Sequence, residues 1–576
     1  MTVRARGLFV LLAAAAALAL PAAAWAHAVL VRTTPQASAV INTPPAVVLL
    51  TYSEAVEPRF ASVSVTDAAG TQQIAGPPRR SASDPTTLVV PLRRVPQGWY
   101  LVYWRVISVD GHPVRGAFTF AVGPNPGPPP QFNIPSLSET AATPRLIAAR
   151  SVAFISVMAA IGLFFLRIGI ARPVVRRVPR TRLRSVSIAF GLAAGVALLA
   201  IPVYVDMATA QFARRSPLDL GNVVPLLRQS AFGRGYLDLE LTFALFVVAS
   251  LLSLWVDRPE RERRSVAELL ALIGAGLGAA ATLVIPGVAG HAGQTSPRGA
   301  AILFDWLHLV AGSVWIGGLI GLLVLWWSLP VARRVAALVV SVPRFSNVAF
   351  ASVVVLVGSG IGSALLHFPT LASLWQTSYG KALLVKIGLL GGTTLLAAVN
   401  LLRTRPRLVA SRQRPELGPG AAQLLRSLVS SEAVLVAGAV VAAAVLSSLA
   451  PPAKALASVS QASPRVGPGP VAEVVNRNGY RLEFRVAPNR AAAPNDFSVR
   501  ISRSGAPVRR ATVVIKFAML DMEMGQQSYV LSETGPGVYA RSSPALVMVG
   551  HWGVGLEITP PGQAPFTVQF VDHATG

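Results

Sequence analysis

Residues 265–286 read SVAELLALIGAGLGAAATLVIP, and Glu268 is the only charged residue among them. A run of about 20 apolar residues is long enough to cross the hydrocarbon core of a bilayer as a helix. Similar runs recur along the middle of this 576-residue chain, in which 53% of the residues are hydrophobic and 13% are charged. Soluble proteins carry about 25% charged residues. The sequence therefore predicts a multi-pass membrane protein.

Eight apolar segments are predicted to be membrane helices, near residues 145–171, 185–207, 236–256, 265–286, 301–328, 347–367, 381–402 and 429–450. The loops between them alternate in charge. Nineteen Lys and Arg residues lie in loops 172–184, 257–264, 329–346 and 403–428, whereas the three alternate loops hold five. Because basic loops stay in the cytoplasm, this asymmetry predicts that both ends of the chain lie outside.

The formal net charge of +26 would suit a nucleic-acid-binding protein, but the distribution of the charge does not. The arginines cluster in short loops, and the sequence has neither zinc-finger spacing nor a basic stretch interleaved with aromatic residues. We therefore expect no nucleic-acid partner. The chain contains no cysteine, which excludes disulfides and thiolate metal sites. A metal ion would need imidazole, thioether, carboxylate, amine or backbone oxygen ligands.

Residues 1–26 have the pattern of a secretory signal peptide. Two arginines precede an apolar stretch, and Ala24-Trp25-Ala26 fits the small-x-small cleavage pattern. The alternative is an uncleaved first membrane helix, which the proline near its end disfavours. Cleavage after Ala26 would make His27 the first residue of the mature chain. Its free amine and its imidazole both present lone pairs near neutral pH and together can chelate one metal ion.

Residues 27–122 are predicted to form a small β-sandwich or barrel, because short β-prone runs alternate with turn sequences. Asp110-Gly111-His112 lies between the last two runs, where a turn would let Asp110 and His112 point at one spot. Taken alone, this motif is most simply an Asp-Gly turn with an exposed histidine. Together with an N-terminal His27, its imidazole, carboxylate and amine groups favour a Cu(II) site.

This segment resembles the CopC copper-resistance domain. The resemblance rests on four short matches, His27-Ala28, Thr34-Pro35, YSEAV at 52–56 and SVDGHP at 108–113. It implies a seven-stranded Greek-key β-sandwich that binds Cu(II) through the amine and imidazole of His27, Asp110 and His112. Glu54 lies where the family has a glutamate near the site, which implies a supporting role. The segment contains no methionine, so the Cu(I) site of some family members is not expected.

The predicted topology gathers the histidines of the membrane segment in its outer half. His291 lies in the loop before the fifth helix, His308 about two turns into that helix, and His367 at the outer end of the sixth. Asp305 shares a helix face with His308. A carboxylate and an imidazole at membrane depth need a partner or a function. The alternatives are a hydrogen-bonded structural cluster and a copper path, and we favour the copper path.

Residues 144–450 resemble the CopD membrane domain. The matching motifs are HLVAGSVWIGG at 308–318, RFS at 344–346, Gly358 to Gly362, TSYGK at 377–381, Lys386 and Asn400. The resemblance implies a protein that handles copper or transports it across the membrane. Lys386 is expected either to repel cations or to pair with Asp305. The sequence has no Walker or phosphorylation motif, so we do not expect ATP to drive transport directly.

Linkers rich in proline and glycine are predicted at 123–143 and 451–470, and a second small β-sandwich at 471–576. This last segment resembles the YtkA-like or FixH-like extracytoplasmic domains. It holds four of the seven methionines, Met519, Met522, Met524 and Met548. Thioethers favour Cu(I), and His551 follows Met548 closely. Methionine also fills cores without any metal, so a Cu(I) site and a structural role stay equally open. His573, near the C-terminus, is assigned no role.

The leading hypothesis is a copper-binding protein of a bacterial plasma membrane that serves copper resistance, homeostasis or uptake. Its soluble domains are expected in the periplasm, and its partners are copper ions, the bilayer and other extracytoplasmic copper carriers. No enzymatic activity is expected. One alternative is a copper-dependent oxidase built on His27, although Asp110 would fill the open position that oxygen activation needs. Another is a haem protein with His308 and His367 as axial ligands.

Overall fold

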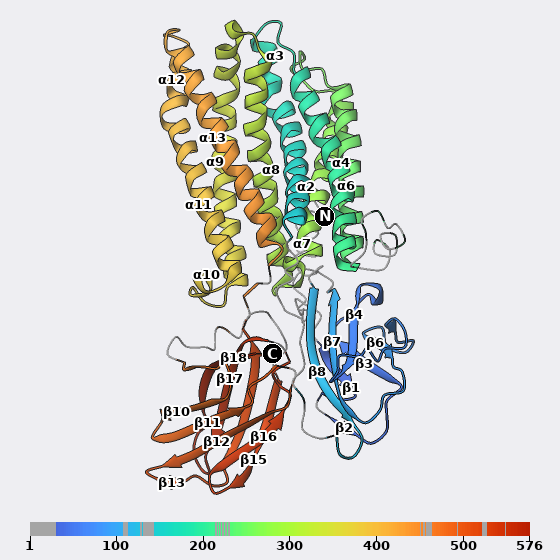
Figure 1. Ribbon diagram of the computed structural model, residues 1–576. Coiled ribbons are helices and arrows are strands. Elements are labelled where there is room, and N and C mark those ends of the chain that lie inside the picture. The colour runs from blue at the N-terminus through green and yellow to red at the C-terminus, as the bar shows by residue number, and fades with distance from the viewer. Residues whose placement is uncertain are drawn as a thin grey trace, which may run out of the picture. The chain divides into compact units, whose positions relative to one another are not determined.

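The computed structural model in Figure 1 describes most of the chain beyond the predicted signal peptide. The described residues are 30–107, 113–126, 143–213, 231–449 and 463–575, apart from 38, 492, 521–526 and 548, together with a few isolated positions. Contacts divide the chain into two compact units, one that contains the long helices and one that contains the β domains.

The N-terminal β domain is a sandwich of two four-stranded sheets, with strand orders β1-β3-β6-β5 and β2-β8-β7-β4. The chain crosses between the sheets after β1, β2, β3, β4 and β6, as the strands of a Greek-key sandwich do repeatedly. The predicted fold class is confirmed, with eight described strands where seven were expected, two of which have only two residues each. The strands are β1 (Leu30–Thr34), β2 (Val40–Ile41), β3 (Val47–Tyr52), β4 (Ser62–Asp67), β5 (Arg79–Arg80), β6 (Thr87–Pro91), β7 (Gly98–Ile107) and β8 (Pro113–Val122).

Alternating residues build the core of this sandwich. Val48, Leu50 and Tyr52 of β3 are buried while the residues between them are partly exposed. This is the period of two that a strand with one covered face requires. They join one core cluster with residues of β7 in the opposite sheet, such as Val102 and Trp104.

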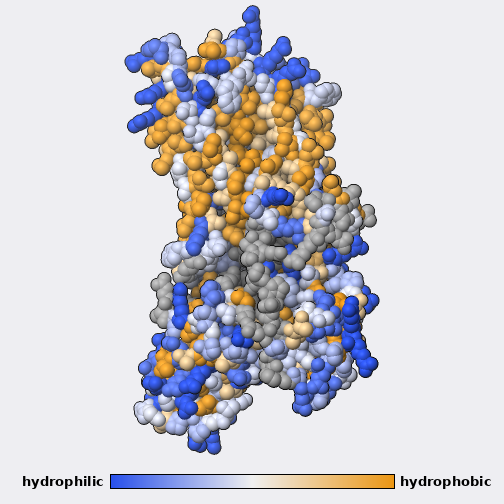
Figure 2. Space-filling model, in the orientation of Figure 1, coloured by the Kyte–Doolittle hydropathy of each residue, from blue (hydrophilic) through white to orange (hydrophobic). Residues whose placement is uncertain are grey.

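Eight helices are long and apolar enough to cross a membrane, as predicted, within the described residues. Figure 2 shows an apolar surface over these helices, bounded by hydrophilic side chains at the end of the bundle that carries α3 and α12. The helical elements are α2 (Pro144–Phe165), η2 (Leu166–Ala171), α3 (Arg172–Arg177), α4 (Arg184–Ala213), α6 (Ala231–Val256), α7 (Val266–Ala289), η3 (His291–Gln294), α8 (Arg298–Ser328), α9 (Val331–His367), α10 (Ser373–Gln376), α11 (Ser378–Val399), η4 (Asn400–Thr404), α12 (Arg405–Ala410) and α13 (Leu417–Leu446).

Two helices begin well before their apolar segments. Helix α9 begins at Val331 rather than near residue 347, and α13 begins at Leu417 rather than near residue 429. Apolar length reports only the part of a helix that crosses the hydrocarbon core. In α9, Arg333 and Arg334 are good helix formers, so the backbone hydrogen-bond ladder includes this basic segment beyond the core.

The helices approach closely where glycines face one another. A methyl group on Gly162 of α2 would overlap the carbonyl oxygen of Ser313 on α8, and one on Gly317 would overlap the backbone of Gly162. Small residues that let two backbones meet are typical of membrane helix contacts. Ser313 and Gly317 belong to the 308–318 motif, so part of that motif serves packing.

A buried ion cluster joins three elements at the α3 end of the bundle. Arg167 of η2 and Arg172 of α3 contact the two carboxylate oxygens of Asp257, at 2.6 Å and 3.0 Å. Glu268 of α7 lies 4.0 Å from Arg172 and caps its own helix through Ser265. Buried charges are tolerated when each has partners, so this cluster fixes η2 and α3 against the start of α7.

The C-terminal β domain is a ten-stranded sheet that folds over on itself through β15. Phe484 of β11 stacks on Phe570 of β18 at 4.6 Å, and Phe497 of β12 meets Phe517 of β14 at 4.8 Å, so the two halves pack face to face. The strands are β9 (Arg465–Val466), β10 (Val471–Arg477), β11 (Tyr480–Ala487), β12 (Asn495–Arg503), β13 (Ala506–Pro507), β14 (Thr512–Met519), β15 (Gln527–Gly535), β16 (Val538–Ser543), β17 (Gly550–Thr559) and β18 (Phe566–Ala574).

Candidate metal sites

The three predicted Cu(II) ligands, His27, Asp110 and His112, lie outside the described residues, but their flanking strands are well defined. Leu30, the first residue of β1, pairs with Tyr52, the last residue of β3. Strands β7 and β8 pair continuously from Gly98 and Val122 to Ile107 and Pro113.

A ring contact brings these strand ends together. The rings of Tyr52 on β3 and Trp104 on β7 meet edge to face at a centroid distance of 5.5 Å. Because Tyr52 also pairs with Leu30, this contact places the start of β1 close to β7. Gly116 of β8 is required here, because a methyl group on it would come within 2.7 Å of the Trp104 ring. Glu54 follows Tyr52 by two residues and is half-buried at the same end of the sandwich.

His308 of α8 is oriented by a serine on α9. The hydroxyl of Ser359 donates to the carbonyl oxygen of Val355 at 2.6 Å, so its oxygen accepts from Nδ1 of His308 at 3.2 Å. Nδ1 therefore carries the imidazole hydrogen and Nε2 presents its lone pair. This is the state in which a histidine can bind a metal ion through Nε2.

Lys386 of α11 faces that lone pair. Its Nζ atom donates to Nε2 of His308 at 3.3 Å. The sequence left two roles open for Lys386, repulsion of cations and pairing with Asp305, and did not identify this contact with His308. Asp305 interacts electrostatically with Lys386 and also lies against α7, where a methyl group on Gly287 would come within 3.0 Å of its Oδ2 atom. Asp305 and His308 thus share a helix face, and both interact with Lys386 of α11.

Thr295 links the other two membrane-domain histidines. Its hydroxyl oxygen lies 2.8 Å from the carbonyl oxygen of His291 and 3.2 Å from Nε2 of His367. Nδ1 of His367 donates to the carbonyl oxygen of Ser363 at 2.8 Å. The structure thus joins the His291 segment to His367, and gives His308 a separate set of contacts with Ser359 and Lys386.

The predicted C-terminal Cu(I) ligands do not converge among the residues that the structure describes. Met519 is 2% exposed and lies in the core, with Trp552 as its register partner. His551 is the neighbour of Trp552 on the same strand, so it points to the opposite face of the sheet. Met522, Met524 and Met548 lie outside the described residues.

His551 instead pairs with a histidine that the sequence interpretation left without a role. His551 and His573 are register partners on β17 and β18, and their rings stack at a centroid distance of 4.8 Å with 15° between the planes. Both are equally far from Gly562, a positive-φ turn residue between the two strands. Equal spacing about a hairpin turn is the sequence signal that could have identified this pair.

Comparison with known proteins finds matches in three parts of the chain. Family models match as CopC domain at residues 30–123, copper resistance protein D at 339–446 and YtkA-like at 475–557. The copper transport protein CutJ of Bacillus subtilis (strain 168) is 26% identical over 548 residues, which are 93% of this chain and 93% of that protein.

Two further relatives match shorter parts of the chain. Protein YobA of Escherichia coli (strain K12) is 37% identical over 99 residues, which are 17% of this chain and 80% of that protein. The crystal structure of CopC from Methylosinus trichosporium OB3b is 30% identical, with a TM-score of 0.16, and covers 19% of this chain and 99% of that chain. The three family matches follow the order of the sandwich, the bundle and the second β domain.

Proposed function

We propose that this chain, which belongs to the copper transport and resistance family in which a CopC domain, a CopD membrane domain and a YtkA-like domain are fused, captures Cu(II) outside the membrane and passes copper to or across its helices. The family identified from short motifs is confirmed. The related proteins whose printed names give a function are copper transport or copper resistance proteins, which supports copper as the substrate.

Capture of Cu(II) is proposed at His27, Asp110 and His112, within residues 27–122. Nitrogen and oxygen ligands of this kind suit Cu(II) in tetragonal geometry. The contact between Tyr52 and Trp104 supports the proposal, because Tyr52 pairs with the start of the strand that follows His27 and Trp104 belongs to the strand that precedes Asp110. Glu54, half-buried at the same end, is proposed to support the site without binding the ion directly.

The membrane step is carried by one observation, the orientation of the His308 imidazole. Its Nδ1 atom is held by Ser359 of α9, and its Nε2 lone pair faces Lys386 of α11. An imidazole nitrogen with a free lone pair is a copper ligand. We propose that an arriving copper ion takes the place of the Lys386 ammonium at Nε2, and that the segment joining His291 to His367 lies on the same path.

The orientation in the bilayer is proposed from charge. Basic residues gather at the bundle end that carries α3 and α12, which the distribution of hydrophilic side chains in Figure 2 also marks. This end would be cytoplasmic. Helix α8 begins at Arg298, so His308 lies in the half of the bundle nearer the opposite end. Copper from the periplasm, or from other extracytoplasmic carriers, would then reach His308 first.

For the C-terminal domain we propose a metal-holding role. His551 and His573 present two imidazoles on one face, which can chelate one copper ion. A Cu(I) role for Met522, Met524 and Met548 stays a proposal from sequence. Burial of Met519 in the core favours a packing role for that residue.

Neither alternative function gains an observation in the described residues. A haem with His308 and His367 as axial ligands would need both Nε2 atoms, and these face Lys386 and Thr295 respectively. The oxidase alternative depends on residues outside the described parts. A haem absorption band in the purified protein would support the haem alternative.

The test measures cellular copper content in cells that carry the gene, in cells from which it is deleted, and in deleted cells to which the wild type or a variant is returned. Restoration with the wild type should return copper content to its original level, and His308→Ala should fail to do so. Leu303→Ala is the matched control, since Leu303 lies on the same helix and is 49% exposed at the lipid-facing surface. If deletion leaves copper content and copper tolerance unchanged, the transport proposal is wrong.

A further inference from the structure

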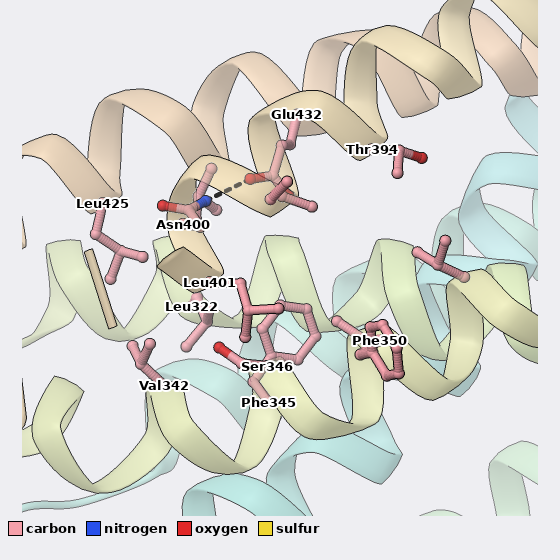
Figure 3. A pocket seen from close by; sticks show the side chains of 15 residues that line it. Leu322, Val342, Phe345, Ser346, Phe350, Thr394, Asn400, Leu401, Leu425 and Glu432 are labelled. Carbon is pink, nitrogen blue, oxygen red and sulfur yellow. Dashed lines mark hydrogen bonds between the residues drawn. The ribbon is translucent and has the colours of Figure 1, made fainter. Parts of the chain in front are cut away.

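A cavity of about 180 Å³ lies between α8, α9, α11, η4 and α13. Most of the side chains around it are apolar, and its polar lining residues are Ser346, Thr394, Asn400 and Glu432. Figure 3 shows the side chains of Asn400 and Glu432 directed toward one another, with Ser346 and Phe345 on the α9 side. Three of the residues that carry the CopD resemblance, Phe345, Ser346 and Asn400, therefore line one cavity.

The cavity is distinct from the His308 site. Ser346 precedes Ser359 by 13 residues on α9, and Asn400 follows Lys386 by 14 residues along α11 and η4. At about 1.5 Å of rise per helical residue, both helices separate the cavity from His308 by roughly 20 Å along the bundle. The two places lie on the same pair of helices, the cavity nearer the basic end.

Glu432 is enclosed in this cavity, with 2% of its surface exposed. Its Oε1 atom accepts a hydrogen bond from Nδ2 of Asn400. The Oδ1 atom of Asn400 is buried and has no hydrogen-bond partner among the described residues. Asn400 begins a π-helical turn, a local widening that occurs frequently at functional sites.

A carboxyl group in an apolar membrane cavity needs a proton or a cation. An ionised carboxylate there is expensive, and a single amide donor does not neutralise its charge. Glu432 is the only titratable residue among those that line the cavity, so no lysine or arginine of the lining is available to pair with it. A side chain needed only for packing at this position would be apolar.

The ligand atoms around the cavity identify the class of ion. Glu432, Asn400, Ser346 and Thr394 offer carboxylate, amide and hydroxyl oxygens, and no histidine or methionine lines the cavity. Oxygen ligands suit hard cations, whereas Cu(I) prefers sulfur and nitrogen. The cavity is therefore suited to a proton or Na⁺ rather than to copper.

We propose that Glu432 and Asn400 form an intramembrane site for a hard monovalent cation, a proton or Na⁺, whose movement is coupled to that of copper. The coupling rests on the proposed copper function, but the binding of the cation does not. A second ion that moves down its own gradient would supply the driving force that an ATP-independent transporter needs. The copper and the coupling ion would occupy separate places on α9 and α11.

The binding test uses full-length protein in lipid vesicles and infrared spectroscopy of the protonated carboxyl band. The wild type should show a carboxyl band that disappears on raising the pH, or on adding Na⁺ at fixed pH. Glu432→Gln should lose the part of this change that the Glu432 carboxyl contributes. The matched control is Glu240→Gln, which removes another membrane-segment carboxyl that does not line the cavity and should keep the change. Loss of the carboxyl band only when the pH is raised identifies a proton site, and loss of the band on addition of Na⁺ at fixed pH identifies a Na⁺ site.

Identical spectra for the wild type and Glu432→Gln in every condition would overturn the proposal. If Glu432→Gln does not fold, Asn400→Ala replaces it. This variant should shift the proton or Na⁺ concentration at the midpoint of the spectral change at least threefold. An unshifted change in that variant would also overturn the proposal.

The coupling test measures copper movement into the same vesicles under an imposed pH or Na⁺ gradient. The gradient of the coupling ion should change the initial wild-type rate several-fold and leave the rate of Glu432→Gln unchanged. Equal gradient dependence in both proteins contradicts coupling through Glu432. If the wild type moves no copper under any gradient, the copper function fails, whereas the infrared result still decides whether the cation site exists.

Discussion

Lys386 donates a hydrogen bond across 3.3 Å to Nε2 of His308, the nitrogen through which this imidazole would bind copper. The ammonium and a copper ion cannot use the same lone pair. They also repel one another, since both are cations in a medium that screens charge poorly. Lys386 therefore competes with copper for Nε2 of His308, and its positive charge repels other cations from this imidazole.

Lys386→Met is expected to tighten copper binding at His308. A hydrogen bond to a charged group contributes about 1.5–3 kcal/mol, so its loss should strengthen binding by about tenfold or more. The measurement is competition with a copper chelator in detergent-solubilised protein. Lys381→Met is the control, because Lys381 is exposed on the same helix and should leave the affinity unchanged. Equal affinities for wild type and Lys386→Met would contradict this competition.

Ser359→Ala is expected to weaken copper binding at the same imidazole. The hydroxyl of Ser359 fixes the ring orientation and the hydrogen on Nδ1 of His308. Loss of such an orienting partner typically costs about 10- to 100-fold in metal affinity. The chelator competition described for Lys386 measures it, and Ser359→Thr, which keeps a hydroxyl, should retain most of the affinity. A Ser359→Ala protein with wild-type copper affinity would show that Ser359 does not orient His308 for copper binding.

Gly162→Ala is expected to destabilise the helix bundle. The added methyl group would overlap the backbone of Ser313, which cannot move aside as a flexible side chain could. Overpacking of this kind costs about 1–3 kcal/mol. Unfolding in mixed detergent micelles measures the change in the free energy of unfolding. Gly191→Ala on α4 is the control, since a methyl group there meets nothing within 4 Å. Equal stabilities for the two variants would show that α2 and α8 do not pack as described.

Protonation of Asp84 in acid is expected to make strand β6 less stable. Hydrogen bonds from the hydroxyls of Thr87 and Thr86, and from the Thr86 backbone N–H, lower the pKa of Asp84 from its ordinary 3.8. A carboxylate with a lowered pKa contributes stability above the pKa of the unfolded chain, and that stability is lost as the pH falls through the lower, folded value. The contribution should therefore be complete near neutral pH and decline below about pH 4.

Amide hydrogen exchange of β6 in the full-length protein checks this pH dependence. Asp84→Asn should exchange faster than the wild type near neutral pH, and the two should converge as the pH falls. Asp496→Asn, an exposed aspartate of the C-terminal domain, should not change exchange in β6. A difference between Asp84→Asn and wild type that is constant across pH would contradict the lowered pKa.

Much of the fold follows from local sequence patterns. Eight helices were predictable because apolar runs of sufficient length report a hydrocarbon environment directly. The early start of α9 was not predictable, because Arg333 and Arg334 are as compatible with a helix as with a cytoplasmic loop. The N-terminal sandwich was predictable from its alternating strands, such as β3, and from its resemblance to a known family.

The site residues that sequence reasoning missed depend on distant partners. Glu432 contacts Asn400 across 32 positions, and nothing local shows that the two face one cavity. A lone carboxyl within a predicted membrane helix was nevertheless a signal of function. His573 was missed because its pairing with His551 depends on the register that the Gly562 turn sets. The predicted proximity of Asp305 and His308 held along the helix, but helix spacing alone does not reveal which neighbours they contact.

The most direct test of the central claim is copper movement into sealed vesicles that contain the purified full-length protein, measured for wild type, His308→Ala and Leu303→Ala. We expect wild type and Leu303→Ala to move copper at similar initial rates, and His308→Ala to be slower by at least about tenfold. Copper movement in His308→Ala at the wild-type rate would contradict a path through His308.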